Sequence, residues 1–443
     1  MLQTLFYIPQ TVAGMPFLGL GLLAGIWAAL AGVYLGVKFL RDGWSDEFQV
    51  GLLYSGVIGA VIVWGLPMIA EARGIPVRGY GLMMLIAVTS SVALAIHRAR
   101  QVGLADDVIY SLAMWMILPG IIGARVFFVI EYRDRFFAPG MSLGESLIKA
   151  ISLQEGGLVV FGSLIGAVLG LLAFTRVYRL PLLPLIDVSV PSMALGQAIG
   201  RIGCFFNGCC FGGECDLPWQ VTFPPESPPY HQQLEKGKLH LDGLAWQAGK
   251  KEDTLLIEHV QENSAAAKLG FVRGQHIVQL RLLSLSGEEL ERLPQTGKNG
   301  EKLLLAHEIV PFLSQAPPKT QLEAVVSERI EPIRWSVESL PERSLPIHPT
   351  QIYSAIDAFI LCGFLWTWIP FRKRHGELLA LTLILHSISR YLLEDIRIDE
   401  SSVFGTPWSI SQNISIGMFA IGVGLLIWVY LGPQREQMRV LRV

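Results

Sequence analysis

The sequence predicts a polytopic α-helical membrane protein of about nine transmembrane helices, with one small α+β domain inserted in a loop. Three observations predict this class. The chain is 51% hydrophobic and only 16% charged over 443 residues, whereas soluble proteins carry about 25% charged residues. Long apolar runs recur, and one long polar stretch separates two groups of them. Because no long basic run accompanies the net charge of -2, no nucleic-acid partner is expected.

The apolar runs are long enough to cross a membrane. A spanning helix needs about 20 mostly apolar residues for a hydrocarbon core of roughly 30 Å. Nine candidate runs lie at 16–38, 50–71, 80–97, 109–130, 157–175, 181–200, 352–370, 376–393 and 410–431. Pro181, Pro184 and Pro191 interrupt the sixth run. The first lacks a charged leading segment and a small-residue cleavage site, so it is expected to be a retained span.

The basic residues of the short loops predict the orientation, because cytoplasmic loops carry an excess of Lys and Arg. The smaller group is Arg73, Arg78, Arg133, Arg135, Arg390 and Arg397. Twelve basic residues fall on the opposite side: Lys38, Arg41, Arg98, Arg100, Arg176, Arg179, Arg372, Lys373, Arg374, Arg435, Arg439 and Arg442. We therefore expect an outward N-terminus, a cytoplasmic C-terminus, and residues 201–351 outside.

This outer segment contains a polar region at 240–335 with β-type runs "TLLIEHV", "HIVQL" and "QLEAVV". Within it, "VQENSAAAKLGFVRGQHIVQL" resembles a PDZ domain, with a strand, a Ser-Ala helix start and Gly-x-x-x-Gly before the next strand. Gln275 stands where that family usually has an aspartate. The resemblance implies capture of a peptide as an added strand at a sheet edge. A degenerate packing module is an equally weighted alternative.

Arginines and glycines gather near the predicted outer ends of the spans. "GRIGCFFNGCCFGG" follows the sixth run, and "HSISRYLLEDIR" ends the eighth. Guanidinium groups offer a planar fork of donors that suits phosphate, and glycines let the backbone approach a ligand closely. Ionisable residues within spans cost roughly 2.5–3.5 kcal/mol on insertion scales, which favours a functional role. The pattern predicts an outward-facing phospholipid headgroup site; snorkelling arginines would not account for the glycine context.

Six strings occur here in the order found in the prolipoprotein diacylglyceryl transferase family, which the chain resembles over about 76–225 and 340–431. They are "YGLM", "GGLVVFGSLIGA", "GRIGCFFNGCCFG", "HPTQIY", "RYLLEDIR" and "SISQNISI". The resemblance implies a seven-helix transferase core at 76–225 and 340–443. Residues 1–75 would then add two helices, and 240–335 would be the PDZ-like insertion.

The resemblance also implies an activity. The expected enzyme moves the diacylglyceryl group of phosphatidylglycerol onto the lipobox cysteine thiol of a prolipoprotein, forming a thioether and releasing glycerol phosphate. Its expected partners are phosphatidylglycerol, prolipoprotein signal peptides and membrane lipid, in the bacterial cytoplasmic (inner) membrane. No cofactor and no metal are expected.

Motif positions assign the site residues by resemblance. Arg201 and Arg390 are expected to hold the phosphate. The expected catalytic set is Arg201, Arg390, His348 and Tyr80. The expected phosphatidylglycerol-binding set is Arg201, Asn207, Gly212, Gln351, Tyr353, Arg390, Glu394 and Arg397.

Phe161 departs from the family, much of which has a histidine or tyrosine there. Phenylalanine cannot take a proton, and the acceptor thiol, with a usual pKa near 8.5, needs another route to thiolate. His348 or His386 is a candidate base, beside the field of Arg201 and Arg390. The role of Arg125, inside the fourth run, stays open between structure and function.

Four of the five cysteines fall within twelve positions: Cys204, Cys209, Cys210 and Cys215. They lack the Cys-x-x-Cys spacing typical of zinc sites, so no metal is expected. On an oxidising side, a disulfide from Cys204 or Cys209 to Cys215 is one outcome. The alternative is that these cysteines serve only as small side chains that fill a tight turn beside Arg201.

Two other functional classes make different demands on the sequence. An intramembrane protease would need a Gly-x-Ser-Gly serine or a His-Glu-x-x-His zinc motif, and neither string is present. A non-catalytic phospholipid-binding receptor or transporter with a peptide-binding PDZ-like module remains the alternative. Release of free glycerol phosphate distinguishes a transferase from such a binder.

Overall fold

The computed structural model describes residues 4–12, 14–70, 73–137, 142–152, 157, 159–225, 227–236, 238–239, 243–248, 255–283, 289–292, 321–327, 329, 331–336, 342–397 and 407–432. The chain divides into two compact units. The first comprises Met1–Met83, Phe206–Cys209 and Thr222–Leu345. The second comprises Met84–Phe205, Cys210–Val221 and Pro346–Val443.

Eight helices within the described residues are long and apolar enough to cross a membrane, which makes this a multi-pass membrane protein. They are α1 (Leu22–Asp42), α2 (Asp46–Ala60) continued to Met68, α4 (Gly79–Gln101), α5 (Asp106–Glu131), α8 (Val160–Val177), α9 (Leu182–Asn207), α13 (Thr350–Trp368) continued to Phe371, and α15 (Ile410–Leu431). Each coincides with one predicted run.

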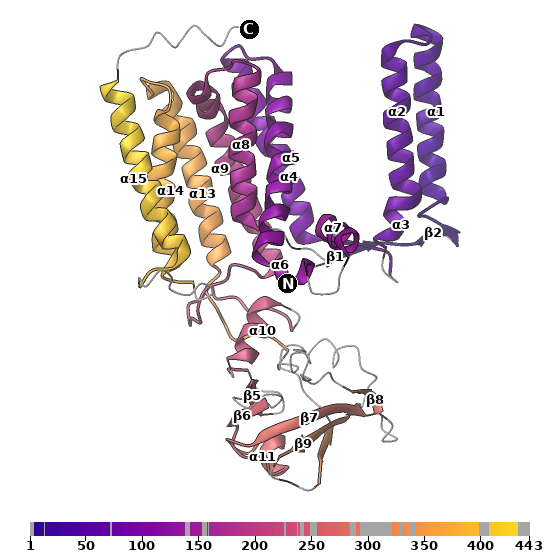
Figure 1. Ribbon diagram of the computed structural model, residues 1–443, viewed down its shortest axis with the longest axis vertical. Coiled ribbons are helices and arrows are strands. Elements are labelled where there is room, and N and C mark those ends of the chain that lie inside the picture. The colour runs from indigo at the N-terminus through magenta and orange to yellow at the C-terminus, as the bar shows by residue number, and fades with distance from the viewer. Residues whose placement is uncertain are drawn as a thin grey trace. The chain divides into compact units, whose positions relative to one another are not determined.

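The remaining run, 376–393, also forms a helix, α14 (Glu377–Glu394). It falls outside the eight, because it carries Glu377, Arg390 and Glu394 in its 18 residues. α14 lies between α13 and α15 in the second unit (Figure 1). The helix α14 therefore places charged residues between two apolar helices, α13 and α15.

Glycines allow α5 and α8 to pack closely in the second unit. A Cβ on Gly162, Gly166 or Gly170 of α8 would lie 2.3, 2.1 or 1.8 Å from a backbone oxygen of α5. These glycines repeat every four residues and so lie on one helix face. Small residues at such spacing let membrane helices approach each other without large side chains between them.

A buried carboxylate joins α9 to the start of α14. Asp187 of α9 is fully buried and accepts hydrogen bonds from the backbone amides of Gly376 at 2.8 Å and Leu379 at 3.3 Å. Arg372 lies 3.4 Å from the same carboxylate and neutralises it. A paired and hydrogen-bonded charge is tolerated in an apolar interior, so this contact sets the position of α14 against α9.

α9 is longer than the sequence predicts. The expected end was residue 200, but the helix continues to Asn207 and carries Arg201 within it. Pro191 lies inside the helix and is buried there. Gly208, at φ 77°, ends the helix, because glycine adopts the left-handed conformation without a Cβ penalty.

The first unit begins with short strands that the sequence did not predict. β1 (Thr4–Ile8) pairs antiparallel with β4 (Ile75–Arg78), and β2 (Thr11–Val12) pairs with β3 (Met15–Pro16). α2 begins at the side chain of Ser45, which accepts the amide of Phe48. Its helix passes through a π-turn at Val61–Gly65 into α3 (Leu66–Met68).

The polar region of this unit forms an antiparallel sheet in the order β10-β9-β7-β6-β5, with β8 paired to β7. The strands are β5 (Leu244–Ala248), β6 (Leu255–Val260), β7 (His276–Leu283), β8 (Glu289–Arg292), β9 (Gln321–Val326) and β10 (Ile333–Ser336). The helix α10 (Pro228–Glu235) packs Tyr230 and Leu234 into its core beside Trp246. The short helix α11 (Ala265–Lys268) lies between β6 and β7 in the chain and is capped by Ser264.

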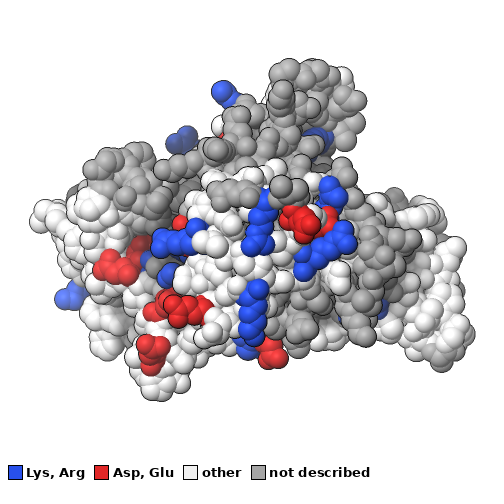
Figure 2. All heavy atoms as spheres, turned by 90° about the horizontal axis from the view of Figure 1, so that it is seen from below, with Lys and Arg blue, Asp and Glu red and all other residues white. Residues whose placement is uncertain are grey.

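Charged side chains of both signs lie among uncharged residues on the face seen from below (Figure 2). Such a mixed surface suits contact with water and lipid headgroups, because charges are costly in hydrocarbon.

Candidate active site

Three motif segments meet through backbone hydrogen bonds in the second unit. The Gly212 amide donates to the His348 carbonyl at 3.1 Å, and the His348 amide donates to the Gly213 carbonyl at 2.9 Å. The Gly213 amide donates to the Ile396 carbonyl at 2.9 Å. The strings "GRIGCFFNGCCFG", "HPTQIY" and "RYLLEDIR" are thereby held together although they are far apart in sequence.

Gly212 is the residue at which this junction leaves no space for a side chain. A Cβ there would lie 2.7 Å from the His348 Cβ and 2.8 Å from the Thr350 Cγ2. Thr350 also donates its hydroxyl to the Cys210 carbonyl at 2.7 Å. The turn after α9 is therefore held on both sides of Cys210 and Gly212.

A buried carboxylate organises the arginines at the end of α14. Glu394 is 5% exposed, forms an ion pair with Arg390 one helical turn earlier, and lies 3.8 Å from the Arg397 Nε. Ser409 donates its hydroxyl to Glu394 at 3.2 Å, and Arg390 donates to the Ser411 hydroxyl at 2.8 Å. Two guanidinium groups share one carboxylate, so the cluster keeps one formal positive charge for an anionic ligand.

Arg201 and Arg390 share a neighbour, His386 of α14. The charges that act on His386 are those of Asp357 on α13, Arg201 on α9 and Arg390 on its own helix. The Nδ1 atom of His386 is buried and has no hydrogen-bond partner among the described residues. Ser389 donates to Asp357 at 2.8 Å and fixes this carboxylate. The two arginines expected to hold phosphate therefore both interact electrostatically with one imidazole.

The "HPTQIY" segment places a second polar group beside the junction. The Trp219 indole donates to the Tyr353 hydroxyl at 2.7 Å, and the His348 Nδ1 lies 3.4 Å from the same oxygen. Gln351 is fully buried. His348, Tyr353 and Gly212 thus belong to one network of the second unit, and Gln351 is buried on the same segment.

Tyr80 and Asn207 belong to the first unit, whereas the residues above belong to the second. Tyr80 is 41% exposed at the start of α4. Its neighbour Gly79 packs against Phe206, since a Cβ on Gly79 would lie 2.9 Å from the Phe206 Cβ. The "YGLM" string therefore approaches the residue preceding Asn207.

The chain matches one protein family over most of its length. A family model described as "Prolipoprotein diacylglyceryl transferase" matches residues 67–428 of the 443. The chain belongs to the prolipoprotein diacylglyceryl transferase family. The matched range includes Arg201, Arg390 and Arg397.

Several relatives of this transferase family carry the name phosphatidylglycerol–prolipoprotein diacylglyceryl transferase. The one from Rhodopirellula baltica is 30% identical over 99% of this chain and 91% of its own length. Those from Trichormus variabilis and Thermosynechococcus vestitus are 32% and 35% identical over 37% and 36% of this chain. These two alignments span 55% and 57% of the relatives' own lengths. Of these three alignments, the first extends over nearly the whole chain.

Within this transferase, Arg125 has a structural role that the sequence left open. Its guanidinium donates to the carbonyls of Lys149, Ala150 and Ser152 at the end of α7 (Leu143–Ile151), and to the carbonyl of Gly157 further along the chain. Helix C-termini present such carbonyls without intrahelical partners, and arginine satisfies them. Arg125 therefore caps α7.

Sequence reasoning left some polar residues of this region outside the expected site set. Asp357, Ser389, Ser409 and Ser411 contact its charged groups or their neighbours. His386 was a candidate base but not a member of that set, and its spacing of four residues from Arg390 places both on one helix face. Ser409 and Ser411 lie in the "SISQNISI" string.

Proposed function

We propose that this chain transfers the diacylglyceryl group of phosphatidylglycerol to the lipobox cysteine of prolipoproteins. The observation that carries the proposal is that Arg390 of α14, held by the buried Glu394, and Arg201 of α9 both interact electrostatically with His386. A phosphate bound there would meet two guanidinium groups. Family membership supplies the reaction class, and the arginine pair supplies the place for the phosphate.

The reaction exchanges one bond for another at a glyceryl carbon. The thiolate sulfur forms a carbon–sulfur bond, and the bond from that carbon to the phosphate oxygen breaks. Its electrons remain on the departing glycerol phosphate. Arg201 and Arg390 stabilise the charge that develops on the phosphate oxygens, which is the role of preorganised donors in a water-poor site. The group passes between two bound substrates, so the reaction uses no cofactor.

The thiol proton needs an acceptor, and His386 is the proposed base. Its buried Nδ1 has no protein partner within the described structure, and Asp357 lies close enough to orient or stabilise the imidazole. The His348 ring nitrogen Nδ1 lies 3.4 Å from the Tyr353 hydroxyl, and the His348 backbone pairs with Gly212 and Gly213. Phe161, 42% exposed on α8, cannot take this proton. We assign His348 to positioning the junction.

Complementation of a transferase-depleted bacterium tests the function. Wild type should restore the gel shift of a reporter lipoprotein, and the purified protein should release glycerol phosphate from phosphatidylglycerol. Arg201→Ala and Arg390→Ala should abolish both signals. Binding of phosphatidylglycerol without release would establish the receptor or transporter instead.

A pH profile tests the base. Wild-type turnover should rise with pH across the range in which imidazole loses its proton, and His386→Gln should lose that limb. His348→Gln serves as the comparison and should retain the limb at lower turnover. A flat wild-type profile between about pH 6 and 9 would exclude a histidine base.

For residues 240–335 we propose a PDZ-like module outside the membrane that recruits prolipoprotein. Support comes from the antiparallel sheet, in which β5 and β10 are the edge strands among the residues that the structure describes; an added strand would pair at such an edge. Deleting this region should slow transfer to full-length prolipoprotein and leave transfer to a short lipobox peptide unchanged. Equal rates for both substrates would reject recruitment.

We also propose that α14 is a ninth span and that the inner membrane is the site of action. The excess of basic residues in one set of loops supports an outward N-terminus and a cytoplasmic C-terminus. The signal peptide of the prolipoprotein would then reach the arginine pair from the lipid phase.

A further inference from the structure

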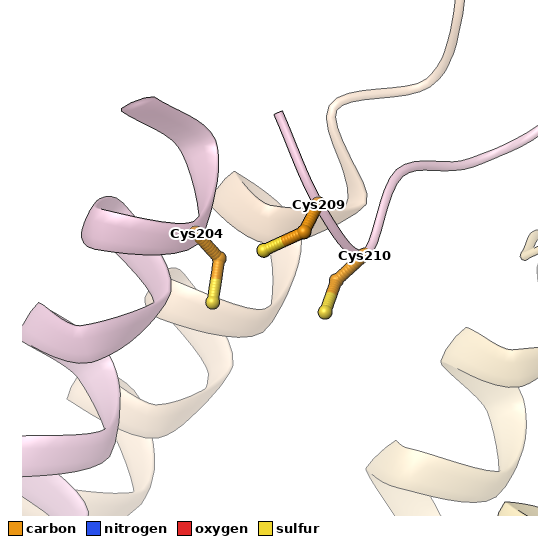
Figure 3. A group of neighbouring side chains, drawn as sticks. All are labelled: Cys204, Cys209 and Cys210. Atoms are coloured by element: carbon orange, nitrogen blue, oxygen red, sulfur yellow. The ribbon is translucent and has the colours of Figure 1, made fainter. Parts of the chain in front are cut away.

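Three cysteines gather in the stretch that ends α9 and turns away from it. The Sγ atoms of Cys204, Cys209 and Cys210 all lie within 4.8 Å of one another. Figure 3 shows Cys204 on the helix and the other two on the turn, with the three sulfur atoms in one place. All three residues lie within seven positions of the sequence, so the cluster is a local feature of the end of α9 and the turn that follows it.

The backbone of this turn is shaped to bring adjacent sulfurs together. In an extended chain, successive side chains point to opposite sides. Cys210 instead has φ 59°, a left-handed conformation that is costly for a residue with a Cβ. The Thr350 hydroxyl, 2.7 Å from the Cys210 carbonyl, helps to hold it. The protein therefore maintains a strained residue at the place where the sulfurs converge.

We propose that Cys204, Cys209 and Cys210 form a three-thiolate site for a thiophilic d¹⁰ metal ion, with Zn²⁺ as the ion to test. Zinc–sulfur bonds of about 2.3 Å in tetrahedral geometry separate the sulfurs by about 3.8 Å. The 4.8 Å limit therefore requires sulfur shifts of about 1 Å or less. A fourth position stays open for water or another ligand.

The chemistry of the cluster selects among ions. Thiolate sulfur favours zinc and monovalent copper, whereas magnesium and calcium need oxygen ligands. Arg201 lies three residues before Cys204 on the same helix, and its positive charge favours thiolates nearby. A disulfide, with its sulfurs about 2.05 Å apart, would use only two of the three. The five cysteines are not joined in disulfides in this structure.

A bound ion would link two parts of the chain that matter for the arginine pair. It would tie Cys204, one helical turn from Arg201, to the turn that leads into Gly212. The three cysteines lack the Cys-x-x-Cys spacing of common zinc sites. Here the end of α9 and the left-handed backbone of Cys210 bring the three sulfur atoms together instead. Zinc binding at these cysteines is a property separate from the transferase reaction, so it can be measured without catalytic turnover.

Metal content of the full-length protein tests the site. The protein is purified in detergent, reduced, stripped of metal and desalted after addition of Zn²⁺. Wild type should retain one zinc per chain. Cys204→Ser, Cys209→Ser and Cys210→Ser should each weaken zinc binding by at least about tenfold. Cys215→Ser is the matched control, because Cys215 lies in the same outer segment outside the cluster, and it should retain zinc.

Thiol alkylation of the wild type keeps the test independent of how the variants fold. Zinc should protect Cys204, Cys209 and Cys210 from alkylation, read by peptide mass spectrometry, and leave Cys215 reactive. No zinc retained by reduced wild type, or equal protection of Cys215, would overturn the proposal. So would a disulfide within the cluster accompanied by no zinc binding after reduction.

Discussion

Gly212 occupies a position where any side chain would collide with two neighbours. A Cβ at this residue would lie 2.7 Å from the His348 Cβ and 2.8 Å from the Thr350 Cγ2. Both neighbours belong to the segment that enters α13, so the collision would separate the backbone pairing of 212–213 with 348. Gly200, one residue before Arg201, lies in the same string, but a Cβ there would meet only the Met84 Sδ at 3.8 Å.

Gly212→Ala should therefore lower stability by about 1–3 kcal/mol and reduce transferase activity at least tenfold, through overpacking at the junction. The matched variant Gly200→Ala should fold normally and keep most of its activity. Thermal unfolding in detergent and the glycerol phosphate assay measure both effects. Equal stability and equal activity of the two variants would mean that the junction accommodates a side chain at residue 212 without loss of stability.

Among the elements, α5 and α8 show how glycines position a helix pair. A Cβ on Gly166 would lie 2.1 Å from the Pro119 carbonyl oxygen, which is backbone and cannot rotate away. On α15, a Cβ on Gly417 or Gly424 would meet nothing within 4 Å. The same residue type thus permits contact on one helix and lies in open space on another.

Gly166→Ala should push α8 from α5 and destabilise the protein by about 1–3 kcal/mol. Gly417→Ala is the control and should be neutral or stabilising by up to about 1 kcal/mol, since alanine favours helices. Thermal unfolding in one detergent compares the two. A stable Gly166→Ala protein would show that the helix pair can separate freely.

The helix α10 carries a buried phenol whose ionisation is costly. Tyr230 is fully buried, its hydroxyl has no hydrogen-bond partner among the described residues, and burial raises its pKa to about 12. Unfolded tyrosine has a pKa near 10. The folded state therefore keeps its proton at pH values where the unfolded state loses it.

This difference predicts that the free energy of unfolding falls as pH rises from about 10 to 12, because the unfolded state binds fewer protons there. Tyr230→Phe should remove that part of the pH dependence. At neutral pH it should be neutral or stabilising by about 1 kcal/mol, because it deletes an unpaired buried hydroxyl. Denaturant unfolding at several pH values, followed by Trp fluorescence, measures both; an equal alkaline slope in the variant would contradict the assignment.

For the whole molecule, orientation in the membrane decides whether the arginine pair and the cysteine cluster meet the outer compartment. Twelve basic residues in one set of short loops against six in the other predict that residues 201–351 face outward. Trypsin added to intact spheroplasts should cleave within this segment and leave a C-terminal tag uncut. Permeabilised cells are the control, in which the tag should also be lost. Loss of the tag from intact spheroplasts would reverse the orientation.

Local properties of the sequence were enough to predict much of the architecture. Hydropathy over about 20 residues predicted eight helices that the structure contains as potential spans, and the β-type runs at "TLLIEHV", "HIVQL" and "QLEAVV" form strands. Helix ends were predicted less well. α9 runs to Asn207 because its last turns still pack as helix until Gly208 offers a left-handed end.

Composition and short strings were sufficient to predict a membrane protein, the places of eight potential spans, and Arg201, Arg390 and Glu394 as candidate site residues. Composition and short strings are both properties of residues that are neighbours in the sequence. Three interactions became visible only in the folded chain: Arg201 and Arg390 both interact electrostatically with His386, Glu394 joins Arg390 to Arg397, and Arg125 caps α7. Such contacts depend on how helices pack, through glycine faces and buried charges, and no local pattern records that packing.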